Sequence, residues 1–247
     1  MGLTTRLTAT PGLLKVAAAF PDPPFDVPGR PPTGFDIDLM QAMAGNLGLH
    51  CAFIGYEGDG FEGIFAGLAD GRWDAVASSA TVTARRRGLA LFCRPYVRSG
   101  QSLVVHVARH PDLRSIEDLA GRSLGVQHGN TSEPVVQRLQ AEGKVGSVRI
   151  YAYRDILVAL GDLEAGRLDA FMKLEPVMRW LIRDRPDLRL VQTGLTDELL
   201  AVAVRLGNAA LAEAIDGAQR RLAANRVLAE LGRRWLGQNS RFTEVLE

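Results

Sequence analysis

Two segments of the chain, 95 positions apart, carry nearly the same sequence: residues 67–76 read GLADGRWDAV and residues 162–171 read DLEAGRLDAF. Each joins a short amphipathic helix, a glycine, a basic residue and an apolar stretch opened by Asp-Ala. This is the pattern of a helix followed by a strand in an α/β domain, where the glycine ends the helix. The repeat therefore predicts two related α/β lobes. Ligands of open α/β sheets bind outside the carboxyl ends of the strands, so two facing lobes also predict a ligand cleft.

The expected elements alternate in both halves. In the first half the apolar patterns predict strands at 13–20, 49–54 and 73–78, with helices from about 34 to 47 and from 61 to 68. A proline-rich loop follows the first strand. This order implies parallel strands joined by right-handed crossovers. The second half repeats it, with strands expected at 101–107, 123–127, 148–151, 169–172 and 188–193 and helices at 116–119, 131–142, 156–166 and 176–184.

The chain is expected to cross between the lobes twice. An alternating apolar stretch at 199–204 returns to the first lobe, and helical patterns fill 211–236. We therefore predict a discontinuous first lobe of residues 1–100 and 199–247 and a second lobe of residues 101–198. Each lobe is expected to hold a largely parallel sheet flanked by helices, and the two crossings form a two-strand hinge.

Composition excludes several classes of function. The chain has 247 residues, 47% of them hydrophobic, and a net charge of +1, so no nucleic-acid or membrane-surface partner is expected. Neither the four histidines nor the two cysteines have metal-ligand spacing, so we expect no metal or cofactor, and Cys51 and Cys93 as buried thiols. The apolar stretches are too short to span a membrane. No signal segment is visible in residues 1–10.

Six motifs along the chain together resemble one family. They read GFDIDLMQAMAGNLGL, FEGIFAGLADGRWDAVASS, TARRRGLALFCRPY, LAGRSLGVQHGNTSE, LEAGRLDAFMKLEP and LAELGRRWLG. In this order and spacing, across about residues 14–237, they resemble the family 3 extracytoplasmic solute-binding proteins of amino-acid ABC transporters. The resemblance implies a two-lobed periplasmic-binding-protein type II fold, a periplasmic or extracytoplasmic location and a monomer. It further implies a protein that is not an enzyme, which closes by hinge motion around a small carboxylate-bearing solute and delivers it to an ABC permease.

The first-lobe site is predicted around an arginine triplet. A carboxylate is held best by a planar guanidinium that donates two parallel hydrogen bonds. Arg86 matches the carboxylate-binding arginine of the family, and Thr81 and Ser79, with Ser78 close by, match its hydroxyl and amide donors. The alternative is that the three consecutive arginines form only a solvated basic turn.

The second lobe is expected to contribute Thr131, in the turn that opens a helix. Gly129 permits this turn, and Thr131 or Ser132 can cap the helix. The family resemblance implies that the same hydroxyl and amides meet the ligand carboxylate. Phe61 matches a family aromatic that stacks on the ligand, with ordinary core packing as the alternative. Phe25 matches an aromatic of the first loop and is expected to pack in the core.

The chain departs from the family at the position that holds the ligand ammonium. The family motif D-A-x-x-x-D-x-P becomes DAFMKLEP, which places Leu174 where the ammonium-binding aspartate belongs. An unpaired buried cation costs several kcal/mol, so an α-amino acid held in the usual way is not expected. Three alternatives remain open: Glu175 replaces the aspartate, Asp22 replaces it from the first loop, or the ligand has no α-ammonium. Lys173 is expected on the surface, with pairing to a second acidic group as the alternative.

Two other classes of function stay open on this fold. Relatives of the family resemble cyclohexadienyl dehydratases, in which case Arg86 would hold the substrate and Glu175 or Asp22 would act as a general acid with a raised pKa. A ligand-sensing regulatory module would use the same closure for signalling. No motif demands either function.

Overall fold

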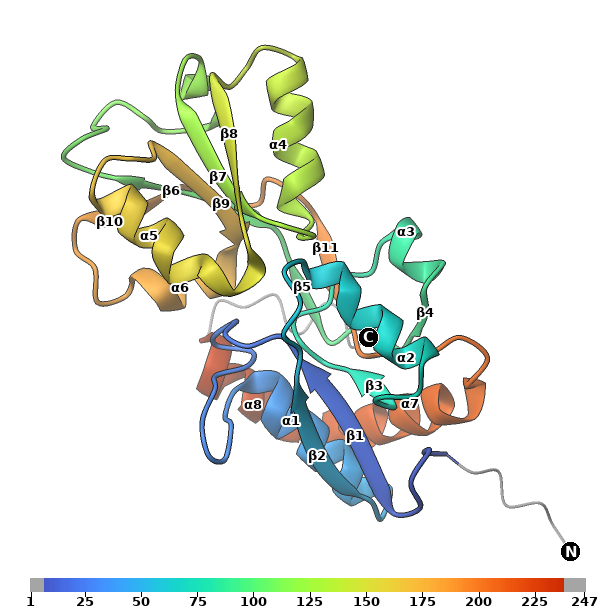
Figure 1. Ribbon diagram of the computed structural model, residues 1–247. Helices are drawn as coiled ribbons and strands as arrows, with labels where there is room; N and C mark the ends of the chain where they lie inside the picture. Colours follow the sequence, from blue (N-terminus) through green and yellow to red (C-terminus); the bar gives the residue numbers. More distant parts are fainter. Residues whose placement is uncertain (1–6, 238–247) are drawn as a thin grey trace, which may run out of the picture. The chain divides into compact units, whose positions relative to one another are not determined.

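Figure 1 shows the computed structural model of the protein, which describes residues 7–237. The chain forms two compact units. Unit 1 comprises Met1–Glu57, Glu62–Arg98 and Glu198–Glu247, and unit 2 comprises Gly58–Phe61 and Ser99–Asp197. The lobe boundaries predicted above did not include the short excursion at Gly58–Phe61. Residues 1–6 and 238–247 of the predicted first lobe lie outside the described residues.

Unit 1 is built on a mixed five-stranded sheet in the order β2-β1-β3-β12-β4. Strand β1 pairs in parallel with β2 and β3, whereas β12 pairs antiparallel with β3 and β4. The expected largely parallel sheet is thus parallel only in its first half, because β12 returns from unit 2 in the opposite direction. The strands are β1 (Leu13–Ala18), β2 (His50–Gly55), β3 (Ala75–Val76), β4 (Ala90–Phe92) and β12 (Ala203–Arg205).

Three helices of unit 1, α1, α7 and α8, pack on one another. Helix α2 lies in the connection between β2 and β3. The predicted helix at 61–68 is split into a 3-10 helix and one turn of α-helix. The bounds are α1 (Phe35–Asn46), the 3-10 helix Phe61–Phe65, α2 (Ala66–Ala69), α3 (Ala84–Arg87), α7 (Ala209–Ala224) and α8 (Val227–Leu236).

Unit 2 repeats the plan of unit 1, with a sheet in the order β10-β6-β9-β7-β8. Strand β7 pairs in parallel with β8 and β9, and β6 pairs antiparallel with β9 and β10. The chain passes from β7 to β8 in one direction and back across to β9 in the other, so right-handed crossovers place α4 and α5 on opposite faces. The strands are β6 (Gln101–His106), β7 (Ser123–Gln127), β8 (Ser147–Tyr151), β9 (Ala170–Leu174) and β10 (Leu188–Gln192).

Side chains from three of these strands form the core of unit 2 beneath α4. Leu103 and Val105 of β6 meet Leu124 of β7 and Met172 of β9, all at most 1% exposed. This alternation along β6 and β9 places every second residue of each strand on the opposite face. The helices are the 3-10 helix Ile116–Leu119, α4 (Ser132–Ala141), the 3-10 helix Tyr153–Asp155, α5 (Ile156–Glu164) and α6 (Glu175–Ile182).

Two short strands mark where the chain passes between the units. Strand β5 (Val97–Ser99) leaves unit 1, β11 (Glu198–Leu200) enters it, and the two pair in a separate two-stranded sheet. The predicted single strand at 199–204 is thus two strands, β11 and β12, which belong to different sheets.

The sequence repeat has the same structural role in both units. Gly71 and Gly166 follow α2 and α5 with φ of 70° and 75°, in the left-handed region that favours glycine. Each repeat aspartate then accepts a backbone amide near the start of the neighbouring parallel strand. Asp74 accepts the Lys15 amide at 2.9 Å, and Asp169 accepts the Ser123 amide at 2.7 Å. The repeat therefore sets the register of β3 on β1 and of β9 on β7.

We expect Asp74→Ala and Asp169→Ala each to lower the free energy of unfolding by about 1–3 kcal/mol, because each carboxylate holds amides at a strand start. Asp74 also accepts the Ala9 amide at 2.8 Å. Urea denaturation followed by circular dichroism measures the change. Asp70→Ala is the matched control, because this exposed side chain pairs only with exposed Arg72 at 3.6 Å in the described structure. A loss no larger than that of the control would contradict this role of the repeat.

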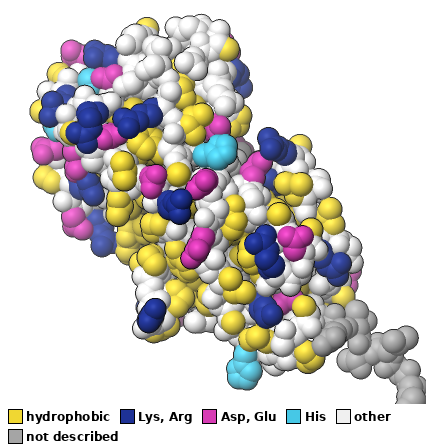
Figure 2. Space-filling view, in the orientation of Figure 1, with side chains coloured by type: hydrophobic (Ala, Val, Ile, Leu, Met, Phe, Trp, Pro, Cys, Tyr) yellow, Lys and Arg dark blue, Asp and Glu magenta, His cyan; other side chains and the backbone are white. Residues whose placement is uncertain are grey.

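The surface and the thiols add three observations. On the face drawn in Figure 2, basic and acidic side chains are interspersed, which agrees with the net charge of +1. Both cysteines are free thiols, but only Cys93, at 4% exposed, is buried as expected. Cys51 is half-buried, and this partial burial raises its pKa to about 12. Across residues 7–237, none of the helices combines the length and the apolar character that crossing a bilayer needs.

Candidate ligand-binding site

The arginine triplet lies on the single turn of α3 in unit 1. The Thr83 hydroxyl caps this turn by accepting the Arg86 amide at 3.1 Å. Arg86 is 3% exposed, whereas the Arg85 side chain is 79% exposed and pairs with Glu62 at 2.7 Å. The alternative of a solvated basic turn therefore holds for Arg85 but not for Arg86, whose side chain is buried.

Thr81 connects Arg86 to a buried carboxylate that sequence reasoning missed. Arg86 Nη1 donates to the Thr81 carbonyl at 3.1 Å, and its guanidinium carbon lies 5.6 Å from the centre of the Phe65 ring. The Thr81 hydroxyl donates to Glu198 Oε2 at 2.6 Å, and both residues are buried. Glu198 lies 117 positions further along the chain, at the start of β11, and no local motif marks it.

Ser78 and Ser79 each contact a buried aspartate of the proline-rich loop in unit 1. Asp22 is fully buried rather than solvated in its proline-rich loop. The Ser79 hydroxyl donates to Asp22, and the Ser78 hydroxyl donates to Asp26. The Ser79 amide donates to Asp36 Oδ2 at 2.6 Å. The two serines thus hold a cluster of carboxylates in place, and their contact with a ligand stays a prediction.

This cluster changes the protonation of its members. Burial, with the charge of Asp22 beside it, raises the pKa of Asp26 well above its ordinary value. Burial also raises the pKa of Asp36 to about 7, although the Ser79 amide and the Tyr96 hydroxyl, which donates at 3.0 Å, both favour its charged form. Asp26, Asp36 and Tyr96 were not identified from the sequence, because nothing local distinguishes a buried aspartate from a solvated one.

In unit 2, Thr131 occupies the position before α4, as expected, but does not cap it. Its backbone is already helical (φ −66°, ψ −18°), so the hydroxyl cannot turn back to the helix amides, and it accepts Gln101 Nε2 at 3.1 Å instead. The expected cap by Thr131 is therefore wrong. Ser132 Oγ is buried and has no hydrogen-bond partner among the described residues. Gly129 has a φ of 74°, as the turn requires.

Phe61 belongs to the short excursion that joins unit 2. Its amide donates to the His128 carbonyl at 3.1 Å, and its ring centre lies 5.3 Å from that of Tyr153. The side chain is 3% exposed. Packing against Tyr153 is thus its role within unit 2, and stacking on a ligand stays a prediction.

The end of β9 holds the positions where the chain departs from the family motif. Lys173 is 2% exposed, with Nζ 4.9 Å from the centre of the Tyr153 ring, so the expected surface location is wrong. The reason is that Tyr153, which follows β8 two strands away in the sheet, has its ring against the Lys173 ammonium. Leu174 is 5% exposed and pairs with Gln101 across β6. Glu175 opens α6 and pairs with Arg179 at 2.7 Å.

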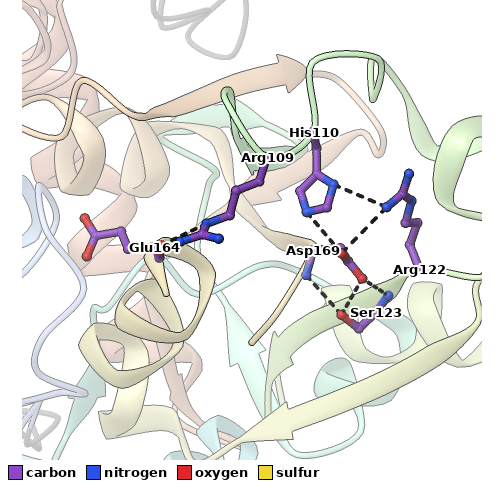
Figure 3. A network of polar contacts seen from close by, with 6 residues as sticks. All are labelled: Arg109, His110, Arg122, Ser123, Glu164 and Asp169. Carbon is purple, nitrogen blue, oxygen red and sulfur yellow. Dashed lines mark hydrogen bonds and ion pairs between the residues drawn. The ribbon is translucent and has the colours of Figure 1, made fainter. Parts of the chain in front are cut away.

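Figure 3 shows a second polar cluster, which lies at the opposite ends of β7 and β9. Asp169 Oδ1 meets His110 Nε2 at 3.0 Å, and Asp169 Oδ2 accepts the Ser123 hydroxyl at 2.7 Å. In a catalytic triad the imidazole would accept the serine proton, whereas here the carboxylate accepts it. Burial opposes ionisation of Asp169, but the Ser123 donors and His110 hold its pKa below the ordinary value. The hydrogen bonds between Asp169 and Ser123 thus join the starts of β9 and β7.

Within residues 7–237, His, Cys, Asp and Glu form no group of three or more that is placed to hold a metal ion. The polar residues described above are a buried guanidinium in unit 1 and, in each unit taken by itself, hydroxyl and amide groups.

Comparison with known proteins identifies the family. The sequence profile of the bacterial extracellular solute-binding proteins, family 3, matches residues 14–238. The chain belongs to this family. ABC transporter arginine-binding protein 1 of Escherichia coli (strain K12) is 26% identical over 223 residues, which cover 87% of each chain.

Solved structures of amino-acid-binding proteins show the same type II periplasmic-binding fold. An ancestral arginine-binding protein bound to arginine has a TM-score of 0.84 at 31% identity, over 92% of this chain and 99% of that one. The ancestral amino acid-binding protein AncCDT-1, a precursor of cyclohexadienyl dehydratase, has a TM-score of 0.81 at 26% identity, over 91% of this chain and 96% of that one. These relatives are named as amino-acid-binding proteins, which supports a solute-binding role.

Proposed function

We propose that this protein binds a small carboxylate-bearing solute, an amino acid or related organic acid, and that Arg86 holds the carboxylate. The observation that carries the proposal is the burial of this one guanidinium in an arginine triplet, beside Thr81. A guanidinium matches the two oxygens of a carboxylate geometrically, and removal from water strengthens the pairing. Thr81 and Ser79 of unit 1, and Thr131 at the start of α4, supply further polar groups.

The proposal extends to transport. Family membership favours a periplasmic or extracytoplasmic monomer that passes its solute to an ABC permease. The paired strands β5 and β11, where the chain passes between the units, are the proposed hinge, because closure around a ligand concentrates at a few connecting residues. The family supports each of these statements by resemblance.

Arg86→Ala tests the proposal. A ligand that binds only the folded state raises the melting temperature by mass action. We expect at least one amino acid or organic acid from a thermal-shift panel to stabilise the wild type, and Arg86→Ala to weaken its binding by about 100-fold or more, the consequence of losing a buried charged partner. Titration calorimetry measures the affinity.

Arg85→Ala is the matched control, because the neighbouring arginine is exposed and pairs with Glu62 in solvent. We expect it to change the affinity less than about threefold, in line with the small contribution of exposed ion pairs. Equal effects of the two substitutions would contradict the role given to Arg86, and a panel without any stabilising ligand would contradict solute binding.

An enzymatic function on the same fold is the second candidate. Two observations favour it: the likeness to a cyclohexadienyl dehydratase precursor, and the raised pKa values of Asp26 and Asp36, which keep protons near neutral pH. Glu175 and Asp22, the general acids considered from the sequence, have Arg179 and the Ser79 hydroxyl as neighbours. Loss of prephenate or arogenate, followed by absorbance, tests this candidate, and turnover would replace simple binding as the function.

A further inference from the structure

Ser79 has an unusual backbone conformation for a residue with a side chain. Its φ is 48°, in the left-handed region that residues other than glycine rarely adopt. Ser79 comes three residues after the end of β3, so it lies outside the carboxyl end of a strand that pairs in parallel with β1. Ligands of α/β sheets bind at this end, and strained backbone conformations concentrate at ligand sites.

A carboxyl group from another element holds this turn. Asp36, the second residue of α1, accepts the Ser79 amide through Oδ2 at 2.6 Å. Asp36 is itself fixed on two sides. The Tyr96 hydroxyl donates to the same oxygen at 3.0 Å, and the Asp36 amide donates to the Phe25 carbonyl at 2.9 Å. Asp36 is 0% exposed, so the contact with Ser79 forms out of water, where hydrogen bonds are stronger.

The burial of Asp36 is unfavourable for the fold. Its other side-chain oxygen, Oδ1, is buried and has no hydrogen-bond partner among residues 7–237. A buried polar oxygen without a partner destabilises a protein, and burial of a carboxylate costs more than burial of an uncharged acceptor. Two local rules are thus broken at one contact, by the conformation of Ser79 and by the burial of Asp36. Such departures are expected at functional sites.

The turn leads directly to the residues proposed to hold the solute. Thr81 follows Ser79 by two positions, and its carbonyl accepts Arg86 Nη1 at 3.1 Å. Between them, the Ala80 carbonyl accepts the Ala201 amide at 3.1 Å, directly after β11. The conformation of Ser79 therefore sets the direction in which the chain enters Thr81.

We infer that Asp36 is a positioning residue of this site: through its hydrogen bond to the Ser79 amide, it holds the segment from Ser79 to Thr81 in the conformation that receives the solute. This role rests on the proposed solute-binding function and adds the group that prepares the site in unit 1 before a ligand arrives. A segment that is already held in its binding conformation loses less conformational entropy on binding. Removal of the acceptor is therefore expected to lower the affinity, although Asp36 acts through Ser79.

Two substitutions of Asp36 test this role by titration calorimetry on the full chain, with L-arginine, L-glutamine and glutarate as probes. Asp36→Ala removes the acceptor, and we expect it to weaken binding of the tightest probe by about tenfold or more. Asp36→Asn keeps an oxygen for the Ser79 amide, and we expect its affinity to stay within about threefold of the wild type. If Asp36→Ala does not fold, Asp36→Leu, which has the same branched shape and no acceptor, serves the comparison.

Ser79→Gly separates positioning from a general effect on packing. Glycine adopts a positive φ readily, so the turn no longer depends on the acceptor. We expect Asp36→Ala to weaken binding by less than about threefold when it is introduced into Ser79→Gly, although it weakens binding by about tenfold or more when introduced alone. A merely structural role of Asp36 would give the same loss in both backgrounds.

Asp38→Ala is the matched control on the same helix. Asp38 Oδ2 accepts Trp235 Nε1 at 2.8 Å and pairs with Arg234 at 3.2 Å, so it contacts α8. We expect this variant to lower the urea midpoint while changing the affinity by less than about threefold.

The outcomes separate the positioning role from the function on which it rests. If a probe binds the wild type and Asp36→Ala equally well, or if Asp36→Asn or Asp38→Ala loses as much affinity as Asp36→Ala, the positioning role is wrong and solute binding stands. An equal loss in the Ser79→Gly background has the same meaning. If none of these probes and no compound of the wider panel binds the wild type, solute binding and the positioning role fail together.

Discussion

Gly34→Ala is expected to leave little folded protein. Gly34 precedes α1 with a φ of 136°, and a Cβ there would lie 2.2 Å from the Phe25 carbonyl oxygen, closer than real contacts allow. The backbone cannot move aside, because the Phe35 amide donates to Pro24 and the Asp36 amide donates to Phe25 at 2.8 and 2.9 Å. We expect a loss of about 3–5 kcal/mol, comparable to the whole stability of many domains.

Gly45→Ala is the control for that substitution on the same helix. A Cβ at Gly45 would have no neighbour within 4 Å, so alanine there should stabilise α1 by up to about 1 kcal/mol. Soluble yield and urea denaturation distinguish the two variants. Comparable stability of Gly34→Ala and the wild type would show that the loop before α1 adapts, contrary to the packing described here.

The second large effect concerns pH. Burial raises the pKa of Asp36 from its ordinary value of 3.8 to about 7, so the folded protein binds this proton more tightly than the unfolded chain does. The resulting stability is fully present below about pH 4 and is lost as the pH rises to about 7. A shift of this size corresponds to about 4 kcal/mol at most.

Asp36→Asn isolates this contribution. An asparagine oxygen can still accept the Ser79 amide and the Tyr96 hydroxyl, but it carries no charge. We expect the variant to gain about 2–4 kcal/mol relative to the wild type between pH 4 and pH 8. Urea denaturation at each pH measures the difference. Asp70→Asn, an exposed site, should show no such trend. A difference between Asp36→Asn and wild type that stays constant over this range would contradict the raised pKa.

Local patterns in the sequence were sufficient to predict most elements. Strand β7 has the bounds expected for it, because the glycine at 121 and the turn at Gly129 interrupt the chain on both sides. Strand β3 was expected to be longer than its two residues. The length of β3 is set by its pairing with β1 and β12. Because β12 lies more than 100 residues further along the chain, no local pattern indicates this length.

The candidate site also contains residues that a local motif predicts and residues that it does not. Arg86 and Thr81 belong to a local motif, so they could be predicted from the sequence. Glu198 and Asp36 could not, because their burial depends on Thr81, Ser79 and Tyr96, which reach them from other elements. Lys173 was misplaced for this reason too, since the ring that covers it follows a different strand.

The position of β12 has a consequence for synthesis of the protein. In the sheet of unit 1, β12 (Ala203–Arg205) separates β3 (Ala75–Val76) from β4 (Ala90–Phe92), although it is translated long after both. A nascent chain on the ribosome therefore holds both strand edges open until residues 203–205 emerge, while Ser99–Asp197 is already complete. During that interval the amino-terminal segment is the natural client of a chaperone, and a chain stopped before β12 would leave those edges available for aggregation.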